Sequence, residues 1–408
     1  MTRIVTLGAA FSANKGAASM LQALLDNLPQ VIGDCRFEVL TTYPEEDLRE
    51  APPGVEVVSC TPIGLPLLHF PLALAAAMGA RLGIPRGWFC RTRALKAIHR
   101  ADIVLDVAGI SFVDGRGIVT LGYNALMTST PLLLGRPVVK AAQALGPFQH
   151  RLNRFFAALI LGRLQAICAR GRATEAHLRT LGLDNVHLVA DLAFSMEDSD
   201  AAVQRAQRRL GAASRDRVAV IPSAVVQEYA RGRGIEYRAE LVKFIDALCE
   251  DRGFDVVLIP HAIRPAARAG RMNDLPLCRE IHSALKSRRH CHLVDESLPP
   301  AELRALIDLC EVTVTSRFHA MVSALATGTP VLVVGWSHKY AEVLEPFGLA
   351  EQAMDYAALS ADELLRGFDA TLKSAPTIRT AIAAVLPTVQ SQSRKNYEAI
   401  ADALEGRS

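Results

Sequence analysis

The feature that most constrains this chain is the regular alternation of short β-rich runs with helical patterns. The run at 4–8 is apolar almost throughout, which is typical of a strand buried on both faces of a parallel sheet. The alternation pauses in the polar stretch 197–216 and starts again with a strand pattern at 217–222. Strand–helix repetition predicts a parallel sheet covered by helices, and the restart predicts a second such sheet.

Each half of the chain carries enough strand patterns for a sheet of its own. The expected strands are 4–8, 36–41, 55–59, 103–107, 137–141, 166–169 and 186–189, and then 217–222, 255–260, 291–294, 312–315 and 331–334. The chain has 408 residues, which is about twice what one hydrophobic core usually supports. We therefore expect an α/β fold with two Rossmann-like lobes that face each other across a cleft.

The domain boundary is expected in the polar stretch between the two series of strands. We predict an N-terminal Rossmann-like lobe at 1–200 and a C-terminal Rossmann-like lobe at 215–385. The remaining residues, 386–408, carry a helical pattern. In two-lobed sheets of this kind, a terminal helix often packs back across the cleft.

Charge and cysteine usage exclude several classes of protein. The 45 basic and 42 acidic residues give a net charge of +3, which offers no electrostatic reason to expect nucleic acid as a partner. The 8 cysteines form no CxxC pair, and the sequence has no HExxH motif and no carboxylate-rich loop. We expect a cytoplasmic enzyme that needs no metal and no cofactor.

One stretch, 62–83, is nearly all apolar and complicates this expectation. Its length approaches that of a membrane span, but Pro66, His69 and Pro71 interrupt it. We favour a buried or cleft-lining helix. The alternative is peripheral contact with the inner face of a membrane, because Arg81, Arg86 and Arg91 follow the apolar run and could meet anionic head groups.

The segment Ser316-Arg317-Phe318-His319 is the strongest candidate for chemistry. It lies between the strand at 312–315 and a small-residue helix, so its charges stand at a helix N-terminus, which favours an anion. A guanidinium recognises carboxylate or phosphate, and an imidazole carries a proton near neutral pH. The structural alternative is that Arg317 pairs with a neighbouring loop and His319 caps the helix. We favour function, because charged residues seldom interrupt so apolar a unit.

Other strand ends on the same edge of the second sheet carry similar groups. His338 and Lys339 follow the strand at 331–334, and His261 follows the strand at 255–260. Lys339 is a candidate partner for phosphate or carboxylate, although it could be an ordinary surface lysine. His261 could act as a second acid–base group or could simply form hydrogen bonds within its loop.

The first half offers weaker candidates at its own strand ends. They are Asn14 and Gly16 after the first strand, Gly109, Ser111 and Asp114 after the strand at 103–107, Gln143 after the next strand, and Arg170 after the strand at 166–169. The first loop lacks the GxGxxG spacing of dinucleotide folds and the GK[ST] of a P-loop. Taken singly, each of these segments is equally compatible with an ordinary loop.

Taken together, these segments resemble the polysaccharide pyruvyl transferase family. The resemblance runs through Asn14-Lys15-Gly16, 109–114, 143–148, Ala169-Arg170, 191–194, 316–319 and Lys339, with the Arg-x-His segment as its most specific part. Ala17 stands where the family often has an aspartate, and Ala108 where a glycine is frequent. Both departures bear on the acceptor more than on the donor.

The resemblance implies a fold like that of the GT-B glycosyltransferases and a transfer of the pyruvyl group of phosphoenolpyruvate to a sugar. It implies catalytic roles for His319, Arg317 and His261, and donor binding by Arg317, Lys339, Ser316, Phe318, Arg170 and His338. It also implies acceptor binding by Asn14, Gly16, Gly109, Ser111, Asp114 and Gln143. The partners would be this small-molecule donor and a sugar acceptor, which could be lipid-linked. No oligomeric state is predicted.

Two other functions remain open at this point. A two-lobed glycosyltransferase that uses a nucleotide sugar would share the fold and the basic site of the C-terminal lobe. A non-catalytic sugar-binding protein of the same fold is the second alternative, but it would need none of Arg317, His319 and Lys339.

Overall fold

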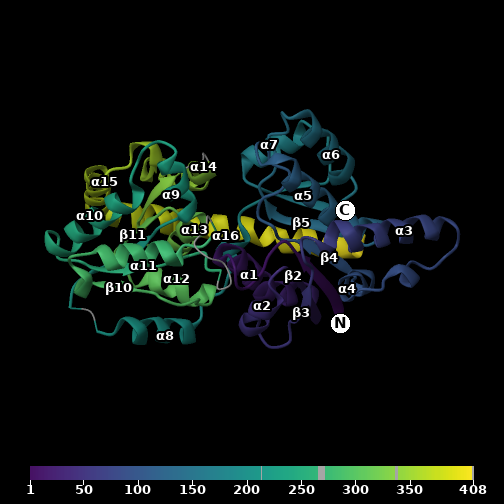
Figure 1. Ribbon diagram of the computed structural model, residues 1–408, viewed down its shortest axis with the longest axis horizontal. Coiled ribbons are helices and arrows are strands. Elements are labelled where there is room, and N and C mark those ends of the chain that lie inside the picture. Colours follow the sequence, from purple (N-terminus) through teal and green to yellow (C-terminus); the bar gives the residue numbers. More distant parts are fainter. Residues whose placement is uncertain (213, 265–271, 336–338, 407–408) are drawn as a thin grey trace. The chain divides into compact units, whose positions relative to one another are not determined.

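The computed structural model describes residues 1–212, 214–264, 272–335 and 339–406. Its contacts divide the chain into two compact units. The first unit comprises residues 1–12, 17–196 and 390–408, and the second comprises residues 13–16 and 197–389. Each unit is built on its own sheet, and the elements of both are labelled in Figure 1.

The first unit contains a seven-stranded sheet with the order β3-β2-β1-β4-β5-β6-β7. All of its strand pairs are parallel. The strands are β1 (Thr2–Leu7), β2 (Cys35–Thr41), β3 (Glu56–Ser59), β4 (Ile103–Asp106), β5 (Val138–Gln143), β6 (Ala166–Arg170) and β7 (Val186–Val189). Their near-complete burial explains why the sequence shows continuous apolar runs and little alternation.

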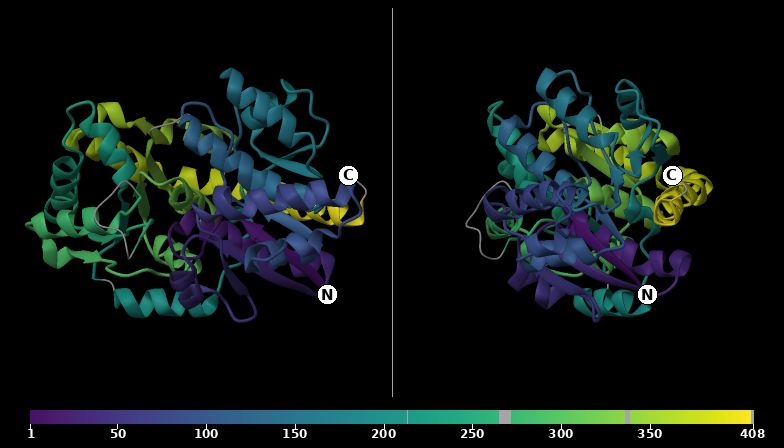
Figure 2. Two further views of the ribbon diagram at one scale, coloured as in Figure 1. Left: turned by 45° about the vertical axis from the view of Figure 1, so that its right-hand side comes forward. Right: turned by 90° about the vertical axis from the view of Figure 1, so that its right-hand side faces the viewer.

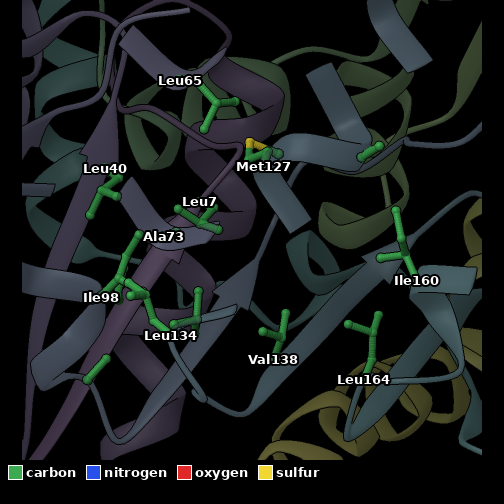
Figure 3. Packing of buried hydrophobic residues seen from close by; sticks show 14 of the residues in the cluster. Leu7, Leu40, Leu65, Ala73, Ile98, Met127, Leu134, Val138, Ile160 and Leu164 are labelled. Atoms are coloured by element: carbon green, nitrogen blue, oxygen red, sulfur yellow. The ribbon is translucent and has the colours of Figure 1, made fainter. Parts of the chain in front are cut away.

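Helices connect the strands of the first sheet. They are α1 (Lys15–Ile32), α2 (Pro44–Glu50), α3 (Phe70–Arg81), α4 (Arg93–Arg100), α5 (Gly117–Leu133), α6 (Arg151–Leu161) and α7 (Arg172–Arg179). A short π-helix, η1 (Leu65–His69), runs directly into α3. Buried side chains such as Leu7, Ile98, Val138 and Leu164 form a continuous core between helices and sheet (Figure 3).

The second unit contains a six-stranded sheet with the order β10-β9-β8-β11-β12-β13. Its strands are also all parallel: β8 (Arg217–Ile221), β9 (Asp255–Leu258), β10 (Cys291–Leu293), β11 (Val312–Thr315), β12 (Val331–Gly335) and β13 (Ala353–Asp355). The α/β class and the two parallel sheets predicted from the sequence are thus confirmed.

The helices of the second unit cover both faces of its sheet. They are α8 (Asp200–Leu210), α9 (Ala224–Arg231), α10 (Tyr237–Glu250), α11 (Leu275–Ala284), α12 (Pro300–Asp308), α13 (Phe318–Thr327), α14 (Lys339–Leu344) and α15 (Ala361–Lys373). The polar stretch before β8, expected as a connection, forms the helix α8. Glu302 of α12 accepts hydrogen bonds from Arg205 and Arg209 of this helix.

The last helix, α16 (Ala375–Glu405), is longer than the sequence pattern indicates. It begins at Ala375, well before the helical pattern expected at 386–408, because Ile378 and Ile382 are buried. Pro387 lies inside it. In Figure 2 it can be followed as one continuous yellow helix. Its residues up to Val389 belong to the second unit, and those from Gln390 onward belong to the first.

The apolar stretch 62–83 is helical but only partly buried. Ala73, Ala76 and Gly79 form the buried face of α3, whereas Leu67 and Leu68 of η1 and Leu74 and Met78 of α3 are exposed. The expectation of a buried helix therefore holds for one face alone. Among the described residues, no helix combines the length and the apolar character needed to cross a membrane.

Candidate active site

The candidate site lies at the carboxyl ends of β8 and β11. From β8 the chain first builds β9 and β10 on one side and then returns to place β11 on the other side. Ligands of open α/β sheets bind at such a switch point, because the loops on its two sides diverge. Ser316 and Arg317 follow β11 directly, and α13 begins at Phe318.

An ion pair between Arg317 and Asp274 anchors this site. The Asp274 side chain is completely buried, and it accepts hydrogen bonds from the backbone N–H groups of Ala224 (2.9 Å) and Ala262 (2.9 Å). A single carboxylate thereby joins the loops that follow β8, β9 and β11. Burial alone would lower the pKa of Arg317, but the charge of Asp274 outweighs burial and raises it. The guanidinium is therefore always charged.

This ion pair matches the structural alternative considered for Arg317. It does not, however, use all of the N–H donors of the guanidinium. The Nε atom of Arg317 is buried and makes no hydrogen bond within the part of the chain that the structure describes. Buried donors are nearly always satisfied in folded proteins. An anionic ligand above the N-terminus of α13 would satisfy this one.

Ser316 and two tyrosines fix the backbone beneath Arg317. The Tyr237 hydroxyl lies 2.8 Å from Oγ of Ser316 and accepts a hydrogen bond from the Ser223 N–H (3.2 Å). The Tyr340 hydroxyl donates to the Ser316 carbonyl (3.2 Å). Burial raises the pKa of Tyr237, so its hydroxyl stays protonated. Ser316 is thus a supporting residue of the site.

His261 lies in a strongly cationic environment. Its side chain is almost completely buried, and its carbonyl accepts a hydrogen bond from the Lys15 N–H (3.3 Å). Burial lowers the pKa of His261 to about 3, with further contributions from the charges of His319, Arg317 and Lys15. His261 is therefore neutral near pH 7. The same interactions show that four basic residues converge on one place.

His319 packs directly against the short segment 13–16, which belongs to the second unit. A β-carbon placed on Gly16 would lie 2.1 Å from Nδ1 of the His319 ring. Only glycine leaves room for the imidazole here. Asn14 caps the helix, because its side-chain oxygen accepts a hydrogen bond from the Gly16 N–H (3.1 Å). The structure thus brings Asn14, Gly16 and His319 together.

The Phe318 ring stands between His319 and Tyr340. Its centroid lies 5.1 Å from that of His319 and 5.8 Å from that of Tyr340, both in edge-to-face geometry. This contact orients the imidazole. Of the two cationic candidates after β12, His338 lies outside the described residues. The backbone of Lys339 begins α14, and its side chain is not described.

Ser111 and Gln143, both acceptor candidates of the first unit, are buried in a polar network. Lys140 forms an ion pair with Asp106 and donates to Ser111 Oγ (3.2 Å). Ser111 donates to Gln143 (2.6 Å), and Gln143 donates to the Asp106 carboxylate (2.7 Å). The polar groups of these residues thus form hydrogen bonds with one another, and they hold the ends of β4 and β5 together. Neither candidate exposes a polar group to a ligand here.

Asp114 also has a supporting role in this structure. Its carboxylate accepts hydrogen bonds from the Gln149 N–H (2.7 Å) and the His150 N–H (3.2 Å), just before α6. The side-chain amide of Asn153 donates to the same carboxylate (2.8 Å). Asp114 therefore fixes its own loop against the start of α6.

Arg170 and Gly109 lie close to each other in the first unit. Arg170 forms a buried ion pair with Asp191 (2.7 Å). Gly109 has a φ of 68°, and a β-carbon there would lie 3.8 Å from Nη1 of Arg170. Nearby, Phe112 and Phe148 adopt φ values of 49° and 63°, which bulky residues rarely do. Backbone strain of this kind tends to gather at functional sites.

Sequence reasoning gave no role to Lys15, Asp274, Tyr237 or Lys140. Lys15 stands between Asn14 and Gly16, which were singled out, so its position after the first strand was the available signal. Asp274 lies just before α11, well beyond the end of β9, and gave little signal. Tyr237 and Lys140 sit within ordinary helix and strand patterns and gave no signal at all. Within the described ranges, no group of His, Cys, Asp and Glu residues is arranged to hold a metal ion.

Comparisons with known proteins bear on the family and the fold of the chain. The family model of the polysaccharide pyruvyl transferases matches residues 14–338. The amylovoran biosynthesis protein AmsJ of Erwinia amylovora is 22% identical over 404 residues, which is 93% of this chain and 94% of that protein.

Solved structures with similar folds include enzymes of nucleotide-sugar chemistry. A putative UDP-N-acetylglucosamine 2-epimerase from Listeria monocytogenes has a TM-score of 0.63 at 12% identity, covering 100% of this chain and 98% of its own. A UDP-glucose: anthocyanidin 3-O-glucosyltransferase has a TM-score of 0.54 at 10% identity, covering 99% of both chains. These likenesses confirm the predicted GT-B-like fold. By its family match over most of its length, the chain belongs to the polysaccharide pyruvyl transferase family and is a transferase.

Proposed function

We propose that this transferase moves the pyruvyl group of phosphoenolpyruvate onto two hydroxyls of one sugar in a polysaccharide or its precursor. The product is a cyclic ketal, and phosphate is released. The observation that carries the proposal is the convergence of Lys15, His261, Arg317 and His319 at the switch point of the second sheet. Asp274, the buried carboxylate at this place, is already engaged by Arg317.

The donor is a small molecule with a carboxylate and a phosphate, and the site offers matching cations. Arg317, fixed by Asp274 above the start of α13, would hold one anionic end. Lys339, at the start of α14, would hold the other, and Lys15 adds positive charge beside His261. Oriented cations of this kind usually contribute the largest share of catalysis.

The reaction would begin with proton transfer from His319. The imidazolium protonates the methylene carbon of the donor, and C2 gains oxocarbenium character. A sugar hydroxyl oxygen then bonds to C2 and passes its proton to a base. The C2–O bond to phosphate next breaks, and a second hydroxyl attacks C2 and loses its proton as the ketal closes.

His261 is the candidate base. Its low pKa keeps it neutral before the donor binds. A bound dianion opposes the surrounding positive charges and so raises the pKa of His261 toward the value that a base needs. The carboxylate of Asp114 is an alternative base, but it is held by three hydrogen bonds in the first unit.

We place this reaction in the cytoplasm. All 8 cysteines are free thiols, which suits a reducing compartment. Expression with a thiol-reactive label added to intact or to lysed cells would test this placement. Labelling only after lysis would agree with it, and labelling of intact cells would contradict it.

The direct test is an assay of the purified chain with phosphoenolpyruvate and a panel of nucleotide-linked and lipid-linked sugars. We expect phosphate release and a mass gain of one pyruvyl ketal on one of these sugars. His319→Ala should abolish turnover while phosphoenolpyruvate still raises the melting temperature. Transfer of a sugar from a nucleotide sugar, without phosphate release from phosphoenolpyruvate, would overturn the proposal. Full activity of His319→Ala would overturn the general-acid role.

A further inference from the structure

A hollow of about 690 Å³ lies in the first unit between α3, α5 and α6. Its walls are formed mainly by large apolar side chains, including Phe70, Leu74, Phe156 and Leu159. Leu74 and Leu159 remain exposed even though they line it. A monomeric protein rarely leaves a large apolar concavity open to water without a partner for it.

Three arginines also line the hollow: Arg81 at the end of α3, Arg86 just beyond it, and Arg163 after α6. No aspartate or glutamate is among the lining residues. In the part of the chain that the structure describes, none of these guanidinium groups forms an ion pair, and Nε of Arg86 is buried without a hydrogen bond. The hollow therefore combines apolar walls with uncompensated positive charge.

Other large apolar side chains on these segments of the first unit are also exposed. Leu67 (74% exposed), Leu82 (80%) and Trp88 (73%) stand on the segments that lead into and out of α3. Further exposed apolar side chains lie at the start of α5 and on α6: Ile118, Val119, Leu152 and Phe155. The helix α3, which carries this surface, is labelled at the right of Figure 1.

We propose that this face of the first unit docks on a membrane that contains anionic phospholipids. Acyl chains would enter the hollow, and lipid phosphates would meet Arg81, Arg86 and Arg163. Long arginine side chains can lie along an apolar surface while their charge stays at the head-group level, and tryptophan favours the same level. The proposal goes beyond the transferase reaction and does not depend on it.

Two observations favour a bilayer as the partner over another protein or a single soluble ligand. The exposed apolar residues extend over η1, α3, α5 and α6, which is more than one small ligand could cover. The charged groups that line the hollow are all cationic, which complements phospholipid head groups.

Vesicle flotation of the full chain tests the proposal. The vesicles contain phosphatidylcholine alone or phosphatidylcholine with phosphatidylglycerol. We expect binding to the second kind, weakened by salt. Leu67→Glu should weaken this binding at least tenfold, because it removes an exposed leucine that the membrane contact would bury. The double variant Arg81→Gln with Arg163→Gln should weaken it by about fivefold for each arginine.

The matched control is Leu48→Glu with Arg49→Gln, since both residues are exposed on α2 in the same unit. This variant should bind like the unchanged chain. Circular dichroism melts of all variants exclude unfolding as a cause. The proposal is overturned if no vesicle binds, if both kinds bind equally, or if Leu67→Glu binds like the control. It is also overturned if Leu67→Glu breaks up a lipid-free oligomer, because the face would then be an interface between copies.

Discussion

The two units share a strand order but differ in what stands at the ends of their central strands. In the first unit, the positive charge of Lys140 is neutralised by Asp106 and shielded by Ser111 and Gln143. In the second unit, Arg317 has a carboxylate partner yet keeps a buried donor unused, and other cations surround it. The same fold thus uses buried charge to hold strand ends together in one unit, and we propose that it presents buried charge to a ligand in the other.

Their surfaces differ as well. Every large apolar side chain that is exposed in the described part of the chain lies in the first unit. In the second unit, the large apolar side chains pack into or against the core around β8 to β11. The comparison agrees with our two proposals, which place the donor site in the second unit and the membrane contact on the first.

The largest expected effect is on the neutralised charge of the first unit. Lys140→Met leaves the Asp106 carboxylate buried without its cation, and we expect a loss of about 3–5 kcal/mol of unfolding free energy. Urea denaturation measures it. The double variant Lys140→Met with Asp106→Asn removes both charges and should recover part of the loss. A loss below about 1 kcal/mol for the single variant would show that the ion pair does not stabilise the first unit.

Arg317→Gln tests the opposite use of charge in the second unit. Removing the guanidinium should lower kcat by about 10²–10³-fold, as for other preorganised donors to a developing charge. Steady-state assays of phosphate release measure this. Arg209→Gln breaks ion pairs with the exposed Glu296 and the buried Glu302 elsewhere in the same unit and should leave kcat unchanged. Equal losses in both variants would contradict a specific role for Arg317.

Gly16→Ala probes the contact that positions His319. The new β-carbon would lie 2.1 Å from the imidazole, so the ring must move, and a displacement of this size can cost up to about 10²-fold in kcat. Gly122→Ala is the control, because a β-carbon on Gly122 of α5 meets nothing within 4 Å. Unchanged kcat in Gly16→Ala would show that the position of His319 does not matter to catalysis.

The smallest effect concerns pH and His261. Its pKa is about 3 in the folded chain and 6.5 ordinarily. Between these values the unfolded chain binds a proton that the folded chain does not, so stability falls as the pH drops below 6.5. The slope approaches about 1.4 kcal/mol per pH unit. His261→Gln should flatten the dependence in denaturation curves recorded between about pH 6 and pH 4. If the slope of unfolding free energy against pH is unchanged, the His261 side chain is more solvated than the structure shows.

The sequence predicted twelve of the thirteen described strands, because buried parallel strands leave continuous apolar runs, but it missed the short edge strand β13. It also located Arg317 and His319, since charges between a strand and a small-residue helix stand out. It could not identify Asp274 as the partner of Arg317, because the ion pair joins loops that are distant in sequence. Nor could it show that Lys140 is buried, because its neutralising partner lies on another strand.

The apolar stretch at 62–83 shows a further limit of pattern reasoning. Its alanines and glycine turned out to face the core, while its larger side chains Leu67, Leu74 and Met78 remained outside. Hydrophobicity alone predicts burial of the larger side chains first. Only the packing of small residues against α5 reveals the reverse arrangement.

The last helix carries a consequence for biosynthesis. Residues beyond Val389 belong to the first unit, where Asn396 accepts a hydrogen bond from the strained Ala142 N–H (2.9 Å) and Tyr397 bonds to the Ala23 carbonyl (3.0 Å). A nascent chain therefore lacks these contacts until residues 390–405 have left the ribosome. The first unit would mature only then, and stalling before that point would expose it to chaperones and proteases.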